Sequence, residues 1–152
     1  MRTFKGLVFF LVLCLSVEIL GGWLTALSVR DWYPSLVKPP FTPPSWLFGP
    51  VWTLLYVLMA IAAWLVWRRP HRYELWLFGL QLFLNLSWSF LFFGLKNPFF
   101  ALLDIVVLWF AIVATLIAFW KVDRRAGILF LPYLMWVTYA VYLNAGIWLL
   151  NK

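Results

Sequence analysis

The sequence predicts an all-α membrane protein, a compact bundle of five transmembrane helices with a proline-rich lid loop between the first and second helices. Hydrophobic residues make up 66% of the 152 residues and charged residues only 11%, a composition that does not fit a soluble domain. Five apolar stretches each reach the roughly 20 residues that a helix needs to cross a bilayer. They cover residues 6–27, 45–67, 75–95, 97–120 and 126–150. Residues 1–152 are therefore expected to form a single transmembrane domain, with no room for a soluble catalytic domain.

The first stretch shares some features with a signal peptide. Arg2 and Lys5 precede its apolar core, as basic residues do in such peptides. However, the stretch is too long, Glu18 interrupts it, and no clean cleavage site of small residues follows. We therefore expect it to remain in the protein as the first transmembrane helix.

The loop before the second stretch is stiffened by prolines. A proline cannot donate a backbone N–H and biases its neighbour toward extended backbone, so this segment is a poor helix and a poor strand. Aromatic residues run from the loop directly into the second stretch. We predict a semi-rigid lid over the mouth of a pocket, formed by Trp32, Lys38, Pro39, Pro40, Pro43 and Pro44.

The remaining loops set the topology. The short loops RRPHR, KN and KVDRR make consecutive helices antiparallel neighbours. The side that holds the N-terminus carries eight basic residues and the other side four, which predicts that the N-terminus lies inside. We expect a multi-pass protein of the bacterial cell membrane. Because the basic residues flank the spans, they indicate membrane lipid as a partner and no nucleic acid.

Each span is expected to have one face that does not simply contact lipid. Residues three or four positions apart share a helix face. Polar, small and aromatic residues recur at this spacing in all five spans. The predicted inner faces are Glu18, Gly22 and Thr25; Trp52, Tyr56, Ala60 and Ala63; Gln81, Asn85, Trp88 and Phe92; Phe100, Asp104, Val107 and Ala111; and Trp136, Ala140, Leu143 and Ile147.

The polar residues inside the spans have two readings. Asp104 and Asn85 are costly in hydrocarbon, so both are expected to point into the bundle. Asn85 either lines a pocket or joins helices by hydrogen bonds, and the sequence leaves both open. For Asp104 and Glu18 we favour a structural role.

The twelve tryptophans fall into two groups. Those near the ends of spans are typical of the aromatic belt at a membrane surface; they are Trp23, Trp46, Trp67, Trp76, Trp120 and Trp148. Trp52, Trp88 and Trp136 lie on the predicted inner faces instead. These three are the better candidates for contact with a ligand.

The sequence lacks the arrangements that catalysis requires. It contains no Cys–His pair within reach, no serine nucleophile motif, no phosphate loop and no cluster of metal ligands. His71 is the single histidine, and we expect it to be a solvated loop residue. We therefore expect no enzyme, no metal site and no obligatory cofactor. An aromatic pocket with few polar groups under a lid is typical of a receptor for a flat hydrophobic ligand.

Several motifs in a fixed order make the chain resemble the translocator protein family, also called tryptophan-rich sensory proteins, TspO/MBR or the peripheral-type benzodiazepine receptor. The resemblance covers nearly the whole chain. It rests on Trp32-Tyr33, Leu36-x-Lys38-Pro39, Pro43-Pro44-x-Trp46-x-x-Gly49-Pro50-Val51-Trp52-x-x-Leu55-Tyr56, Gln81-x-x-x-Asn85-x-x-Trp88, Phe92-Phe93-Gly94, Ala101-Leu102-x-Asp104, Pro132-Tyr133-Leu134-x-Trp136 and Leu143-Asn144.

The resemblance implies an upper pocket, closed by the first loop, that binds porphyrins such as protoporphyrin IX and synthetic benzodiazepine-type ligands. Carried over by position, the ligand-binding residues are Gly22, Phe48, Gly49, Trp52, Asn85, Phe100, Trp136, Ala140 and Leu143. The resemblance also implies a homodimer. It further implies a slow light-dependent breakdown of bound porphyrin, with Trp52 and Trp136 as the electron donors.

Two positions depart from the family pattern. Phe100 stands where many members have Trp, which removes an indole N–H donor. Ala145 replaces the Tyr of the sterol-recognition pattern of animal members, so we do not expect specific cholesterol binding.

The leading hypothesis is thus a membrane receptor that binds porphyrin for sensing, transfer or disposal. The spans contain no histidine that could ligate haem iron, so the metal-free ring is favoured. Two alternatives stay open: a structural or regulatory membrane protein that acts through a protein partner, and lipid or sterol binding.

Overall fold

The computed structural model describes residues 2–70 and 73–152. All regular structure in these two ranges is helical, and the long helices are α1 (Arg2–Ala26), α2 (Phe48–Trp67), α3 (Leu75–Ser89), α4 (Pro98–Val122) and α5 (Arg124–Asn151). Short helical turns at Tyr33–Ser35 and Ser45–Leu47 lie in the first loop, and a π-helical segment, Phe90–Gly94, continues α3. His71, which the sequence assigns to a loop, lies outside the described residues.

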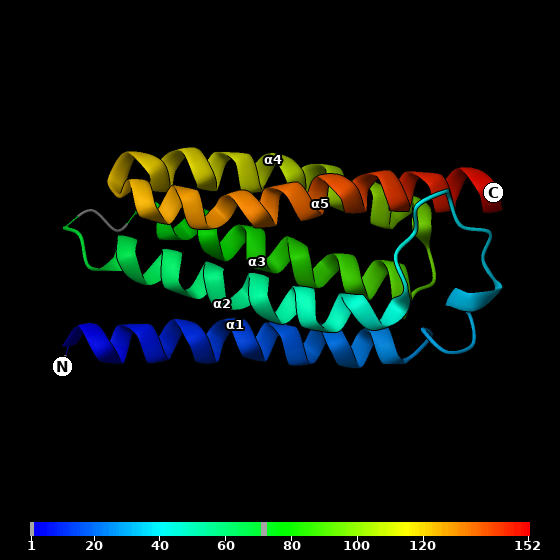
Figure 1. Ribbon diagram of the computed structural model, residues 1–152, viewed down its shortest axis with the longest axis horizontal. Coiled ribbons are helices and arrows are strands. Elements are labelled where there is room, and N and C mark those ends of the chain that lie inside the picture. The colour runs from blue at the N-terminus through cyan, green and yellow to red at the C-terminus, as the bar shows by residue number, and fades with distance from the viewer. Residues whose placement is uncertain (1, 71–72) are drawn as a thin grey trace.

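The helices form an elongated bundle (Figure 1). In Figure 1, α1 lies along one edge, α4 and α5 lie along the opposite edge, and the first loop covers the end near the C-terminus. Each of the five helices is long and apolar enough to cross a membrane. The predicted bundle of five transmembrane helices is therefore confirmed, and the observed helix ends lie within a few residues of the predicted ones.

A single aspartate ends α4 and begins α5. The Asp123 side chain accepts a hydrogen bond from the backbone N–H of Arg125 at 3.0 Å, as an N-cap does. Its carboxylate also pairs with the guanidinium groups of Arg125 at 3.0 Å and Arg69 at 3.1 Å. These hydrogen bonds, that of the Arg125 side chain above all, lower the pKa of Asp123 to about 2. Asp123 thus fixes the α4–α5 turn and ties it to the end of α2.

The core fills the half of the bundle near the N-terminus. Phe78 of α3 stacks on Phe119 of α4 with the ring centroids 6.2 Å apart, and Phe130 of α5 packs edge-on against both. Small residues of α2, among them Ala60 and Ala63, are fully buried, so neighbouring helices approach α2 closely. Rings fill this half tightly, whereas the half under the first loop encloses a cavity.

The predicted inner face of α4 is wrong at Phe100 and Val107, whereas Ala111 is buried as predicted. Phe100 and Val107 lie on the outer surface, 51% and 55% exposed. Asp104 is half-buried, and its Oδ2 atom has no hydrogen-bond partner in the described part of the chain. The face that packs inward consists of Ala101, Ile105, Leu108, Ala111, Ile112, Thr115 and Phe119. The α4 sequence is apolar on all sides, so periodicity alone does not choose between neighbouring faces.

Candidate functional site

A cavity of about 860 Å³ lies under the first loop, within the size range of small-molecule sites. Side chains from α1, α2, α5, the end of α3 and the loop itself line it. Most of its wall is apolar or aromatic. The half of the bundle that the large core rings leave unfilled is thus a pocket inside the membrane-spanning region.

Eight of the nine residues predicted for the pocket lie on the cavity wall: Gly22, Phe48, Gly49, Trp52, Asn85, Trp136, Ala140 and Leu143. Phe100 is not among the lining residues. It lies on the outer surface near the start of α4, where its backbone N–H donates to the Asn97 side chain at 3.0 Å. The shift of the α4 inner face described above accounts for this difference.

Aromatic rings form two walls of the cavity. On one wall, Trp52 lies 5.7 Å from Tyr56 between ring centroids, and Phe48 packs edge-on against Trp136 at 5.8 Å. On the other wall, Trp88 stacks on Phe92 at 5.1 Å with an interplanar angle of 23°. These contacts orient flat apolar surfaces toward the cavity. A flat aromatic ligand would find stacking partners on both walls.

The wall deep in the bundle is a chain of hydrogen bonds. The Tyr56 hydroxyl donates to Asn85 Oδ1 at 2.9 Å, and Asn85 Nδ2 donates to the Tyr133 hydroxyl at 2.7 Å. Tyr133 in turn donates to Gln81 Oε1 at 2.8 Å. Asn85 therefore does both things that the sequence left open, because it lines the cavity and also joins α2, α3 and α5.

A second buried amide fixes the orientation of Trp88. The Trp88 indole N–H donates to Asn144 Oδ1 at 2.8 Å, and Asn144 Nδ2 donates to the Pro98 carbonyl at 2.9 Å. The bond links α3 to α5 and the start of α4. Trp88 is thereby held with its indole N–H directed at protein and not at the cavity. A ligand would meet mainly its π-face.

Two charged residues, Glu18 and Arg30, line the cavity in the described part of the chain. Glu18 lies on α1 and accepts a hydrogen bond from the Thr53 hydroxyl of α2. Arg30 lies in the first loop and is exposed. Glu18 thus has the α1–α2 bond that a structural role requires, and it also lines the cavity. The two charges leave the cavity with a cation at its loop end and an anion on its α1 wall.

Hydrogen bonds attach the predicted lid to α5. The Tyr142 hydroxyl donates to the Pro40 carbonyl at 2.7 Å, and the Tyr139 hydroxyl donates to the Phe41 carbonyl. The ring of Pro39 packs on Gly146, where an added Cβ would lie 2.7 Å from Pro39 Cβ and Cγ. Pro39 and Pro40 of the predicted lid are therefore anchored to α5.

None of the six predicted lid residues is among those lining the cavity. Trp32 packs edge-on against Phe92 at 5.5 Å, on a ring that itself lines the wall. The Lys38 ammonium lies 4.6 Å from the ring centroid of Tyr33 and donates to the Leu36 carbonyl at 3.2 Å. The loop residues on the cavity itself are Val29, Arg30, Tyr33, Ser45 and Trp46.

Sequence reasoning missed several cavity-lining positions, among them Tyr33, Trp46 and Asn144. Tyr33 and Asn144 line the cavity but belong to no predicted face, although both belong to or lie next to family motifs. Trp46, predicted for the interfacial belt, also lines the cavity while remaining 72% exposed. Burial raises the pKa of Tyr33, with a smaller contribution from Tyr139. Its phenol therefore stays neutral beside Lys38.

Comparison with known proteins agrees with this architecture. A model of the TspO/MBR family matches residues 10–149. The chain is 44% identical over 144 residues to the tryptophan-rich protein TspO of Chlorobaculum tepidum, covering 91% of each chain. It is 39% identical over 136 residues to the tryptophan-rich sensory protein of Cereibacter sphaeroides, covering 89% of this chain and 84% of that protein. It is also 36% identical over 143 residues to the translocator protein of Bos taurus, covering 88% of this chain and 85% of that protein. The chain belongs to the TspO/MBR family.

Proposed function

We propose that this protein is an integral membrane receptor for porphyrins and related flat hydrophobic ligands, which it senses, transfers or passes on for disposal. The observation that carries the proposal is the cavity of about 860 Å³ with its largely apolar and aromatic lining. The names of the relatives, sensory protein and translocator protein, support a role that responds to or moves a ligand.

The charges of the cavity favour one orientation of the ligand. A metal-free porphyrin offers a wide π-face to Trp52 and Trp136 and carries two carboxylates that prefer a cation. Arg30 lies at the loop end of the cavity, whereas Glu18 lies on its α1 wall. Like charges repel in a medium of low dielectric constant. The carboxylates of the ligand would therefore point toward the loop and Arg30.

The membrane setting extends the proposal. The excess of basic residues on the N-terminal side favours an N-terminus inside the bacterial cell membrane, with the first loop and the cavity mouth outside. The family resemblance also supports a homodimer. A cysteine-accessibility assay with single cysteines at Lys5 and Lys96, in a Cys14→Ser background, would measure which end of the bundle is inside.

Saturable quenching of tryptophan fluorescence tests the proposed function. Protoporphyrin IX added to the detergent-solubilised protein should quench the tryptophan fluorescence. The quenching should depend hyperbolically on porphyrin concentration and saturate at about one porphyrin per chain. A competing benzodiazepine-type ligand should reverse the quenching. Quenching that rises linearly without saturation would show only partitioning into the micelle, and it would favour a protein that acts through a partner.

We further propose that bound porphyrin breaks down only under illumination in the presence of oxygen. Trp52 and Trp136 line the cavity and are the side chains best suited to give an electron to the excited ring. Trp136→Phe should slow the breakdown and keep most of the binding, because Phe retains a π-face but is a poorer electron donor. Loss of porphyrin in the dark at a similar rate would contradict this proposal.

A further inference from the structure

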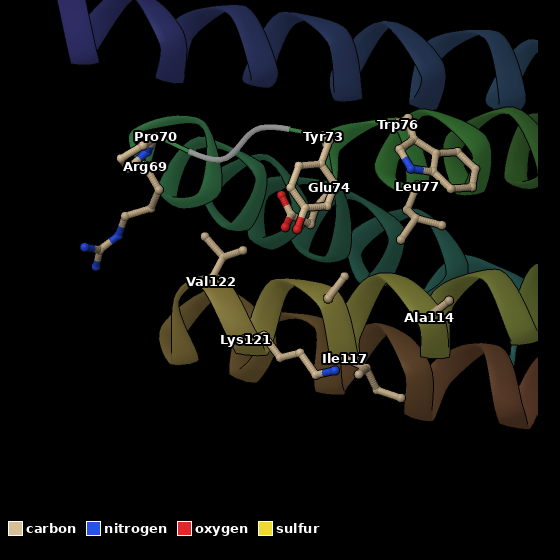
Figure 2. A pocket seen from close by; sticks show the side chains of 11 residues that line it. Arg69, Pro70, Tyr73, Glu74, Trp76, Leu77, Ala114, Ile117, Lys121 and Val122 are labelled. Carbon is tan, nitrogen blue, oxygen red and sulfur yellow. The ribbon is translucent and has the colours of Figure 1, made fainter.

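A second hollow lies at the opposite end of the bundle, between the start of α3 and the end of α4 (Figure 2). This groove has a volume of about 710 Å³ and shares no lining residue with the cavity under the first loop. Its apolar floor includes Leu77 of α3 and Ala114, Ile117 and Val122 of α4. Because both helices meet the membrane boundary here, the groove lies at the level of the lipid headgroups.

One oxygen of the buried Glu74 carboxyl group has no hydrogen-bond partner in the described part of the chain. The residue lines the groove but is only 7% exposed. Its Oε2 atom is buried and has no hydrogen-bond partner among residues 2–70 and 73–152, while the Tyr73 phenol hydrogen-bonds to the same carboxyl group. No ion pair involving Glu74 occurs in those ranges. A buried carboxylate is costly unless a cation or further donors compensate it.

The residues around Glu74 indicate which kind of ligand could supply that cation. Lys121 of α4 lines the groove and forms no ion pair within the described residues, whereas Arg69 is already paired with Asp123 at 3.1 Å. Trp76, which is 63% exposed, also lines the groove and is typical of the headgroup level. Figure 2 shows Glu74 at the start of α3 and Lys121 across the groove on α4, with the Lys121 ammonium on the side of α4 away from Glu74. The groove is thus lined by an acidic residue of α3, a basic residue of α4 and apolar side chains between them.

We propose that this groove binds an aminophospholipid, a zwitterionic phospholipid whose headgroup ends in a primary ammonium, as in phosphatidylethanolamine. The ammonium compensates Glu74, the phosphate contacts Lys121, and an acyl chain follows the apolar side chains toward Ala114. The match is one of charge, because the headgroup carries one positive and one negative group and the groove is lined by Glu74 and Lys121. The exposed Tyr73 side chain would move aside, and the ammonium would then reach the Glu74 carboxylate.

Related lipids fit the groove less well. A choline headgroup keeps the positive charge but has no N–H to donate, so it cannot satisfy the Glu74 carboxylate by hydrogen bonding. An anionic phospholipid could contact Lys121 but would leave the buried carboxylate without a counter-charge. The groove should therefore prefer headgroups whose ammonium carries N–H donors over headgroups of similar size that lack them.

Native mass spectrometry of the full chain tests this proposal. The detergent-solubilised protein is titrated with dioleoyl phosphatidylethanolamine, its N-methyl and N,N-dimethyl derivatives, and dioleoyl phosphatidylcholine. We expect the apparent Kd to rise about tenfold across the series, with the largest step at the last methylation, which removes the final N–H donor. Equal affinity for all four lipids would overturn the proposal, and it would equally be the result if Glu74 and Lys121 satisfied each other directly.

Two variants locate the site. Glu74→Gln should remove the preference for the ethanolamine headgroup, whereas Asp31→Asn, which removes an exposed acid in the first loop, should keep it. Ala114→Trp should fill the groove from α4 without altering Glu74, and should abolish the same preference even if Glu74→Gln fails to fold. Retention of the preference in Ala114→Trp would overturn the assignment. Since no porphyrin is present, the outcome is independent of the proposed function.

Discussion

Val37 and Asn151, 114 positions apart, exchange two hydrogen bonds across the mouth of the bundle. The Val37 N–H donates to Asn151 Oδ1 at 2.9 Å, and Asn151 Nδ2 donates back to the Val37 carbonyl at 2.7 Å. The Asn151 side chain, in the last turn of α5, therefore satisfies both backbone hydrogen-bonding groups of Val37 and holds the first loop in place. A side chain of α5, and not the loop prolines alone, sets the position of the lid.

Loosening this attachment should speed ligand release. The double variant Asn151→Ala, Tyr142→Phe removes the Val37 pair and the bond to Pro40, each worth about 0.5–1.5 kcal/mol net. We expect the dissociation rate of porphyrin to rise about fivefold or more, with unchanged helix content by circular dichroism. Stopped-flow displacement by a competing ligand measures the rate.

Ser35→Ala is the matched control for the lid. Its hydroxyl donates to the Trp32 carbonyl within the loop and does not contact α5, so release should stay close to the wild-type rate. If the double variant releases ligand no faster than this control, the loop does not gate the cavity.

The polar wall of the cavity should be important for stability. In Asn85→Leu, the Tyr56 hydroxyl loses its acceptor and the Tyr133 hydroxyl loses a donor, while both remain buried. An unsatisfied buried polar group costs about 1–3 kcal/mol, so the free energy of unfolding should fall by that amount. Unfolding in mixed micelles with increasing denaturing detergent measures it.

Ser87→Ala provides the comparison within α3. The Ser87 hydroxyl donates only to the Phe83 carbonyl one turn earlier, so its loss should change the unfolding free energy by a few tenths of a kcal/mol at most. Equal destabilisation by both variants would show that the Asn85 network contributes nothing beyond a local hydrogen bond.

The α4–α5 turn should give the fold a specific acid sensitivity. The ordinary pKa of an aspartate is about 3.9, and in the folded protein that of Asp123 is lowered to about 2. Because the folded pKa is the lower one, ionised Asp123 stabilises the fold above about pH 4, and this contribution is lost as the pH falls toward about 2. Asp123→Asn should therefore lose less thermal stability than the wild type between about pH 5 and about pH 2.

Asp31→Asn isolates that effect, since Asp31 is exposed and makes no ion pair in the described ranges. Its acid-induced shift in unfolding temperature should equal that of the wild type. An unchanged shift in Asp123→Asn would contradict the role of the pairs with Arg69 and Arg125.

The sequence predicted the features that depend on residue type and spacing. Runs of apolar residues located all five helices, and helical spacing placed Trp52, Asn85 and Trp136 on one cavity. Periodicity failed at Phe100 because α4 is apolar on every side, so its inner face depends on how small residues such as Ala101 let helices approach. The attachment of the loop to α5 could not be predicted from the sequence either. Tyr142 donates to the backbone carbonyl of Pro40, and every residue has such a carbonyl, so residue type does not identify the partner.

The most direct test of the receptor account is the affinity of protoporphyrin IX for Trp52→Ala compared with Trp148→Ala. Trp52 lines the cavity, whereas Trp148 packs on Phe99 outside it. Porphyrin absorbance, which does not depend on the protein tryptophans, reports binding in both variants. The account predicts that Trp52→Ala weakens binding by about 1–3 kcal/mol, as expected for loss of a large aromatic contact, and that Trp148→Ala binds like the wild type. Equal weakening in both variants, or none in either, would contradict the assignment of the cavity as the porphyrin site.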